Sequence, residues 1–140
     1  MTETAAGWDD VHRELPDALR PFLPDIEWDR ERLWRLELPV EEMSVDELEW
    51  QLELPFWRDG ERFFSVRPTD VLTIPNAQYA HFEQTMDADL AVPIDVTLRA
   101  GRWFVLDGVH RLLKAFALGE TVVRVRKLPP DALVLIAATS

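Results

Sequence analysis

The step from Asp107 to Gly108 constrains the fold of this chain most, because it joins a strand-like run directly to a helix-like run. Residues 103–106 are apolar and aromatic, which is typical of a buried strand. The apolar residues of 112–118, followed by Gly119, predict a short helix with a glycine stop. The turn between them lies at a helix N-terminus, where backbone amides lack partners and the helix dipole is positive. Such a turn can bind a phosphate.

The side chains of this turn supply the candidate site residues. Gly108 lets the backbone approach a ligand, Arg111 can hold an oxyanion with two N–H groups, and Lys114 adds a second charge one turn later. Asp107 has two interpretations, an N-cap of its own helix or a functional carboxylate. His110 likewise is either a structural hydrogen-bonding residue or a catalytic group.

The rest of the C-terminal half predicts a small sheet. Residues 94–98 form a strand, 99–102 a hairpin turn and 103–106 the returning strand. Residues 121–128 predict another strand, in which Val123 and Val125 face away from Arg124 and Arg126. The apolar residues 132–138 predict a final strand or a docked tail.

The N-terminal half carries weaker local signals. Prolines and scattered aromatic residues in 1–33 predict short helical turns that pack on the core. Residues 33–40 alternate loosely and predict a strand. A capping box at Ser44 predicts a helix that buries Val45, Leu48 and Leu52. Residues 57–66 predict a hairpin or loop, and residues 68–72 predict one helical turn. A helix is expected from Asn76 to about Thr85, with Tyr79, Phe82 and Met86 as a stripe facing the core.

Residues 93–128, PIDVTLRAGRWFVLDGVHRLLKAFALGETVVRVRKL, resemble the core of the ParB and sulfiredoxin superfamily. The Asp-Gly-x-His-Arg step between strand and helix carries this resemblance. It implies an α+β fold, in which short helices flank a small mixed sheet. We therefore expect a single domain with a ParB/sulfiredoxin-like core at 34–140 and a helical or irregular extension at 1–33.

Each branch of this superfamily can be compared with residues of the chain. Sulfiredoxins need a cysteine where this chain has Val109, and the chain contains no cysteine, which excludes their chemistry. ParB proteins carry Gly-Glu-Arg-Arg at the place of residues 108–111 and need a helix-turn-helix domain, for which 140 residues leave no room. Free-serine kinases resemble the chain at Asp107, Gly108 and Arg111. The glutamate that acts as the general base in those enzymes would correspond to Glu41 or Glu42.

Charge and hydropathy exclude further function classes. The net charge is −11, with 8 basic and 22 acidic residues in 1–90 but 7 basic and 4 acidic residues in 91–140. This balance argues against direct binding to nucleic acid, and the carboxylates lack the clustered spacing of a nuclease. No apolar stretch approaches the roughly 20 residues of a membrane span, and the acidic start does not resemble a signal peptide. We therefore expect a cytoplasmic protein.

Two hypotheses of function follow, and the sequence leaves open whether the protein is an enzyme. In the first, a nucleoside triphosphate or diphosphate, or another phosphate-bearing ligand, binds at Gly108, Val109, His110, Arg111 and Lys114. A phosphotransferase or NTPase would then use Asp107 to hold Mg²⁺ and His110 to stabilise the phosphoryl group. In the second, the acidic N-terminal half binds a protein partner without catalysis. This hypothesis would be favoured if Trp8, Trp28, Trp50 or Trp57 were exposed and gathered in one patch.

Overall fold

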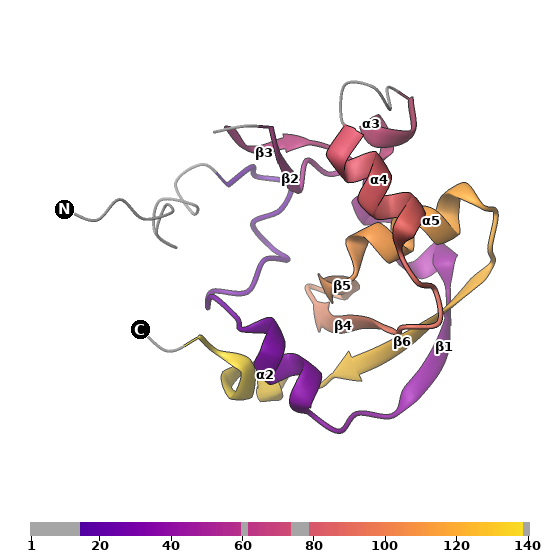
Figure 1. Cartoon of the computed structure of the whole chain (residues 1–140). Helices are drawn as coiled ribbons and strands as arrows, with labels where there is room; N and C mark the ends of the chain where they lie inside the picture. Colours follow the sequence, from indigo (N-terminus) through magenta and orange to yellow (C-terminus); the bar gives the residue numbers. More distant parts are fainter. Residues whose placement is uncertain (1–14, 60–61, 74–78, 139–140) are drawn as a thin grey trace.

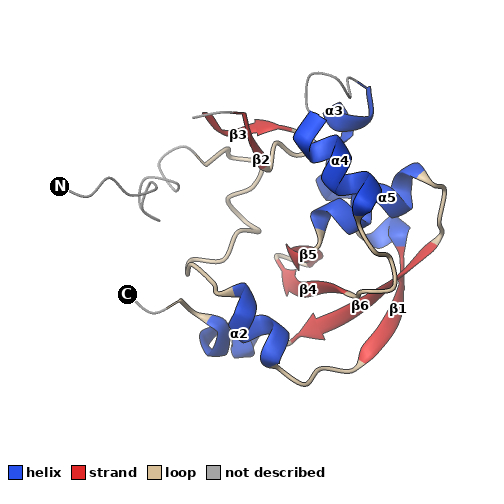
Figure 2. Ribbon diagram, in the orientation of Figure 1, coloured by secondary structure: helices blue, strands red, loops and turns tan. Residues whose placement is uncertain are grey.

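The computed structural model has an α+β fold built on a mixed four-stranded sheet (Figure 2). It describes residues 15–59, 62–73 and 79–138. The strand order is β1 (Val40–Ser44), β6 (Val122–Leu128), β4 (Ile94–Arg99) and β5 (Arg102–Asp107). β4 and β6 are parallel, whereas the other two pairs are antiparallel. None of the helices within the described ranges is both long and apolar enough to cross a membrane.

Helical segments cover both faces of the sheet (Figure 1). One face packs against α3 (Pro68–Thr73), α4 (Tyr79–Asp87), α5 (Val109–Ala117) and the 3₁₀ segments η1 (Val45–Glu47) and η2 (Glu49–Glu53). The other packs against residues 15–28, α2 (Arg30–Arg35) and the 3₁₀ segment η3 (Pro130–Ile136). Strand alternation separates the two cores, because Val105 faces the first while Phe104 and Leu106 face the second.

The predicted hairpin of β4 and β5 is confirmed. Its two turn residues, Ala100 and Gly101, have φ of 49° and 80°, as a tight hairpin turn requires. β6 also follows the prediction, since Val123 and Val125 are buried while Arg124 is exposed. A second hairpin pairs β2 (Trp57–Asp59) with β3 (Arg62–Val66), and α3 contains the predicted helical turn.

The predicted strand over residues 33–40 is wrong, because residues 33–35 belong to α2, residues 36–39 are an irregular connection and β1 begins only at Val40. Asp29 caps the helix by accepting hydrogen bonds from the backbone N–H groups of Glu31 (2.8 Å) and Arg32 (3.4 Å). Leu33 is its one buried residue. The alternation of leucines that suggested a strand therefore comes from a helix followed by an extended connection.

Two other expectations need correction. Ser44 caps a 3₁₀ turn rather than an α-helix, accepting from the Asp46 N–H at 3.2 Å, although Val45, Leu48 and Leu52 are buried as predicted. The core stripe on α4 is wrong for Tyr79 and Met86, which are 61% and 44% exposed, while Asn76 lies outside the described residues. For the C-terminal segment, the docked tail is confirmed and the alternative of a strand is not: η3 docks through buried Leu133 and Ile136.

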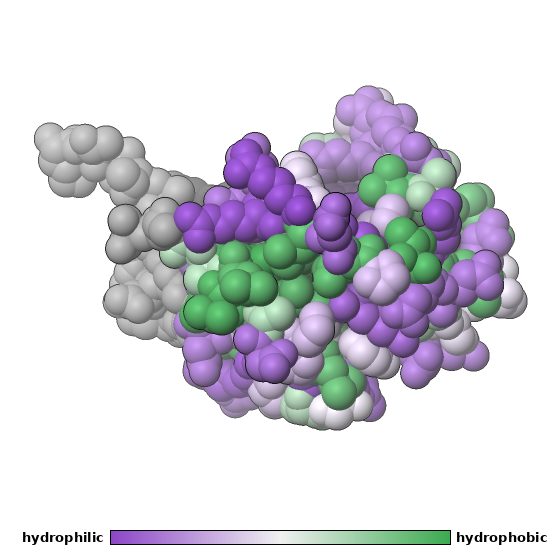
Figure 3. Space-filling model, turned by 90° about the horizontal axis from the view of Figure 1, so that it is seen from below, coloured by the Kyte–Doolittle hydropathy of each residue, from purple (hydrophilic) through white to green (hydrophobic). Residues whose placement is uncertain are grey.

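The segments nearest the two ends of the described chain pack together beneath the sheet. Leu15, Leu19 and Leu23 are buried in the second core, as is Ile136 of η3. Val134 and Leu135 of η3 are exposed, and the view from below shows apolar surface on the side of α2 and η3 (Figure 3). The described part of the predicted 1–33 extension is thus packed on the core.

The edge of β5 is closed by one buried side chain, which gives a test of the fold. Gln51 accepts a hydrogen bond from the Val105 N–H (2.9 Å) and donates to the Trp103 carbonyl (3.0 Å). Gln51→Leu leaves both backbone groups without these partners, so we expect the free energy of unfolding to fall by about 2–4 kcal/mol. Gln84→Leu, on the exposed side of α4, is the matched control and should change it by less than about 0.5 kcal/mol. Urea denaturation measures both, and equal effects would contradict this role for Gln51.

Candidate functional site

A row of charged residues crosses three neighbouring strands near the end of the sheet. In the strand register, Asp95 of β4 lies beside Arg126 of β6 on one side and Asp107 of β5 on the other. Asp95 is only 3% exposed and lies between the buried apolar residues Ile94 and Val96. A buried carboxylate needs compensation by charge and hydrogen bonds; Arg126 supplies both here, and the nearby charge of Arg111 adds to the compensation.

Arg126 connects the sheet to α2. Its Nε donates to Asp95 Oδ1 at 2.7 Å, while Nη1 and Nη2 donate to the carbonyls of Leu36 (2.9 Å) and Leu33 (2.7 Å). These carbonyls belong to the C-terminal end of the helix, where cations interact favourably with the helix dipole. The guanidinium group therefore fixes α2, and with it Trp34, against the sheet.

Asp107 is held by three donors and does not cap α5. Its Oδ2 accepts from Trp34 Nε1 at 2.7 Å and from Arg111 Nη2 at 3.2 Å, and its Oδ1 lies 3.7 Å from Nη1 of Arg30. The N-cap of α5 is Gly108, which provides no side-chain acceptor. The N-cap interpretation of Asp107 is thus wrong, because its carboxylate binds side chains of α2 and α5 instead.

Arg111 is packed directly over Gly108. A Cβ at residue 108 would lie 3.2 Å from the Arg111 guanidinium carbon and 3.2 Å from Ile94 Cγ2, and the φ of 117° there disfavours any other residue. Arg111 Nη1 donates to the carbonyls of Val92 (3.3 Å) and Pro93. The glycine is therefore needed for the position of the arginine as well as for the turn.

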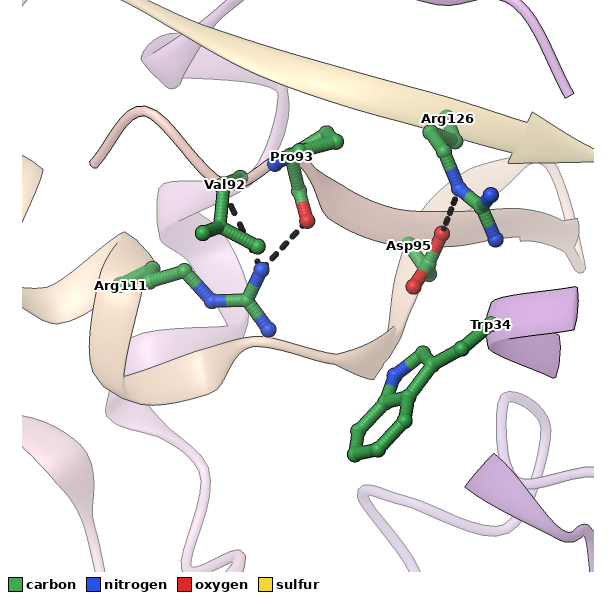
Figure 4. A pocket seen from close by; sticks show the side chains of 6 residues that line it. All are labelled: Trp34, Val92, Pro93, Asp95, Arg111 and Arg126. Atoms are coloured by element: carbon green, nitrogen blue, oxygen red, sulfur yellow. Dashed lines mark hydrogen bonds and ion pairs between the residues drawn. The ribbon is translucent and has the colours of Figure 1, made fainter. Parts of the chain in front are cut away.

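These residues surround a pocket of about 190 Å³. Figure 4 shows the Arg111 guanidinium, the Asp95 carboxylate and the Trp34 indole around one space, which is lined by Trp34, Val92, Pro93, Asp95, Arg111 and Arg126. Burial raises the pKa of Asp95 and the charge of Asp107 adds to the increase, whereas Arg126 and Arg111 oppose it. The pocket therefore combines cationic donors, one strongly desolvated carboxylate and an aromatic wall.

The residues of the predicted phosphate site do not lie together. Arg111 lines this pocket, with Gly108 packed against it and Asp107 bound to it. His110 instead contacts other elements: its Nε2 is 3.2 Å from Nδ1 of His81, and its ring stacks on Trp57 at 4.4 Å. Lys114 donates to the carbonyls of Met86 (2.7 Å) and Ala88 (2.8 Å) at the end of α4.

Three pocket residues were missed by sequence reasoning. Trp34, Asp95 and Arg126 line the pocket but lie outside the run from Asp107 to Lys114 in which the site was predicted. The available signal was a charged residue inside an apolar strand at Asp95, which often marks a buried ion pair or a site. That signal does not reveal which distant residue compensates the charge.

The carboxylates do not fit a Mg²⁺ site. Both oxygens of Asp107 already face nitrogen donors, and the described residues contain no group of three or more histidine, aspartate or glutamate side chains placed to hold a metal ion. Mg²⁺ prefers an octahedral set of oxygen ligands. The Asp107 carboxylate is therefore not placed to hold Mg²⁺.

The tryptophans of the N-terminal half do not gather in one exposed patch within the described ranges. Trp28 donates its indole N–H to the Leu106 carbonyl at 3.1 Å, Trp50 packs against Phe22, and Trp57 stacks on the two histidines. Trp8 lies outside the described residues. The observation that would favour a protein-binding face is thus not present among the tryptophans that the structure describes.

The histidine contact generates a test by pH. Burial, together with the neighbouring charges of His81 and Arg111, lowers the pKa of His110 to about 4 against the opposing effect of Asp107. The unfolded chain binds a proton at this residue near pH 6.5, so it binds more protons than the folded chain between pH 6.5 and 4. The contribution of His110 to stability should therefore be complete above pH 6.5 and decrease as the pH falls toward 4.

His110→Phe keeps a ring against Trp57 and removes the titration. The difference in melting temperature between pH 7.5 and 4.5 should be smaller for His110→Phe than for the wild type. Comparing this difference between the two proteins cancels contributions that they share. One is that of Asp95, whose raised pKa changes stability with pH in the opposite direction. Identical pH dependence in the two proteins would contradict the account of His110.

Comparison of the chain with protein-family models, with curated proteins and with solved structures found no match.

Proposed function

We propose that this chain binds a small phosphate-bearing ligand in the pocket beside Arg111. The observation that carries the proposal is the arrangement of donors around this residue. Arginine has five N–H donors, and the hydrogen bonds of Arg111 to Val92, Pro93 and Asp107 use three of them. The Nε–H and one Nη2–H have no hydrogen-bond partner among the described residues, and guanidinium groups bind phosphate through paired hydrogen bonds.

The local charge supports an anionic ligand in a chain that is otherwise strongly acidic. Arg30, Arg111 and Arg126 face only two carboxylates, Asp95 and Asp107, so the cluster has one positive charge in excess. The net charge of the whole chain is −11. An attraction between unlike charges is stronger in a partly desolvated pocket than on an open surface. The pocket is therefore a favourable place for an anion.

The size of the pocket favours a small ligand. Its volume of about 190 Å³ is below the roughly 300–1,000 Å³ of pockets that enclose drug-sized molecules. A phosphomonoester fits such a space, whereas a nucleotide would place only its phosphate end there. Trp34 is 54% exposed, and its indole N–H is held by Asp107, so its ring offers a fixed surface to the remainder of the ligand. The resemblance to ParB and sulfiredoxin proteins also supports a phosphate ligand.

The proposal concerns binding and not phosphoryl transfer. His110, the residue that would stabilise a transferred phosphoryl group, contacts His81 and Trp57 instead of lining the pocket. Asp107 is occupied by nitrogen donors. A binding role needs neither residue to act on the ligand.

Calorimetric titration tests the proposal with inorganic phosphate, ethyl phosphate, ADP and ATP, each with and without Mg²⁺. We expect at least one ligand to bind, and Arg111→Lys to weaken it by about tenfold or more, because lysine keeps the charge but loses the fork of donors. Arg124→Lys is the matched control, because Arg124 is exposed on β6, two residues before Arg126, and lies outside the pocket. The affinity of this variant for the same ligand should stay within about twofold of that of the wild type.

Two results would contradict the proposal. One is the absence of binding heat and of any shift in melting temperature at millimolar concentrations of every ligand, since a ligand that binds the folded state must stabilise it. The other is unchanged affinity in an Arg111→Lys protein whose circular dichroism is that of the wild type.

A further inference from the structure

One oxygen of the buried Asp95 carboxylate points into the pocket without a donor. Oδ1 accepts from Arg126, whereas Oδ2 has no hydrogen bond to any residue that the structure describes. Figure 4 shows Oδ2 directed away from Arg126, toward the space between Arg111 and Trp34. An ionised oxygen in a residue that is 97% buried is costly unless a donor reaches it. Because Asp95 lines the pocket, a ligand with a hydrogen-bond donor can complete this set of hydrogen bonds.

We propose that the ligand carries an ammonium group close to its phosphate, and that Asp95 Oδ2 binds the ammonium while Arg111 binds the phosphate. This inference rests on the proposed function, because the phosphate places the ligand in the pocket. It adds the class of ligand, a small amine-bearing phosphomonoester. It also gives Asp95 the role of a specificity-determining residue.

The other pocket residues leave Asp95 as the partner for such a group. Val92 and Pro93 contribute apolar surface, and their carbonyls already accept from Arg111. The Trp34 indole N–H is a donor and is bound to Asp107. Among the described side chains that line the pocket, Asp95 is the one hydrogen-bond acceptor.

The charge of the cluster agrees with an amine-bearing phosphate. A phosphomonoester carries close to two negative charges at neutral pH, and an ammonium group reduces this to about one. The cluster of three arginines and two aspartates, of which Arg111, Arg126 and Asp95 line the pocket, has one positive charge in excess. An ammonium also offsets the negative charge that burial makes unfavourable at Asp95, which a neutral hydroxyl group cannot do.

Calorimetry with matched ligands tests this inference at pH 7.5. Phosphoethanolamine and ethyl phosphate differ by the ammonium group, and hydroxyethyl phosphate replaces that group by a neutral donor. We expect the wild-type protein to bind phosphoethanolamine about tenfold more tightly than either of the other two, which corresponds to about 1.4 kcal/mol. Phosphocholine keeps the positive charge without N–H donors and should lose most of this advantage.

Asp95→Asn then assigns the effect to this residue. The variant should bind phosphoethanolamine and ethyl phosphate within about twofold of each other. Its circular dichroism and melting temperature show whether α2 remains docked. If the variant does not fold, the ligand series on the wild type decides by itself.

The outcomes separate the two proposals. If none of the four phosphates binds, the proposed function fails. If ethyl phosphate binds as tightly as phosphoethanolamine, phosphate binding stands and the ammonium inference is overturned. Equal affinity for hydroxyethyl phosphate and phosphoethanolamine would also overturn it, in favour of a neutral donor. A preference for phosphoethanolamine that persists in a folded Asp95→Asn protein would remove the role of Asp95.

Discussion

The guanidinium group of Arg126 is the interaction on which the arrangement of this molecule depends most. It binds Asp95 on the neighbouring strand and the carbonyls of Leu33 and Leu36 at the end of α2. It thus compensates a buried charge, caps a helix and attaches that helix to the sheet. Removing one partner of a buried ion pair typically costs about 3–5 kcal/mol, because the other charge is left desolvated. The position of Trp34 in the pocket follows from this attachment.

Two arginine–aspartate pairs on adjacent strands have different surroundings. Arg126 and Asp95 lie within the sheet, whereas Arg111 and Asp107 lie where β5 ends and α5 begins. The register brings the two carboxylates side by side, which would be unfavourable without the arginines. With Arg30 added, the cluster becomes positive in an acidic chain. This excess, the free oxygen of Asp95 and the fixed ring of Trp34 are the basis of the proposed ligand site.

Local signals predicted the parts of the fold that depend on neighbouring residues. The β4–β5 hairpin, the start of α5 and the alternation of β6 follow from turn residues and periodicity over a few positions. The strand expected at 33–40 was wrong because α2 depends on its Asp29 cap and on contacts with Arg126, about 90 residues away. Helical spacing correctly placed His110, Arg111 and Lys114 on one helix. It could not show that α4 contacts His110 and Lys114, while Arg111 lies at the pocket.

The central claim is that a phosphate binds at Arg111, and nuclear magnetic resonance tests it most directly. In a titration of the ¹⁵N-labelled protein with inorganic phosphate, the account predicts saturable shifts of the Arg111 Nε–H, the Trp34 indole N–H and the Gly108 amide. The indole signals of Trp50 and Trp103, which lie outside this pocket, should not move. Shifts at those distant tryptophans equal to the shift at Trp34, or no saturable shift of the Arg111 signal, would contradict the account.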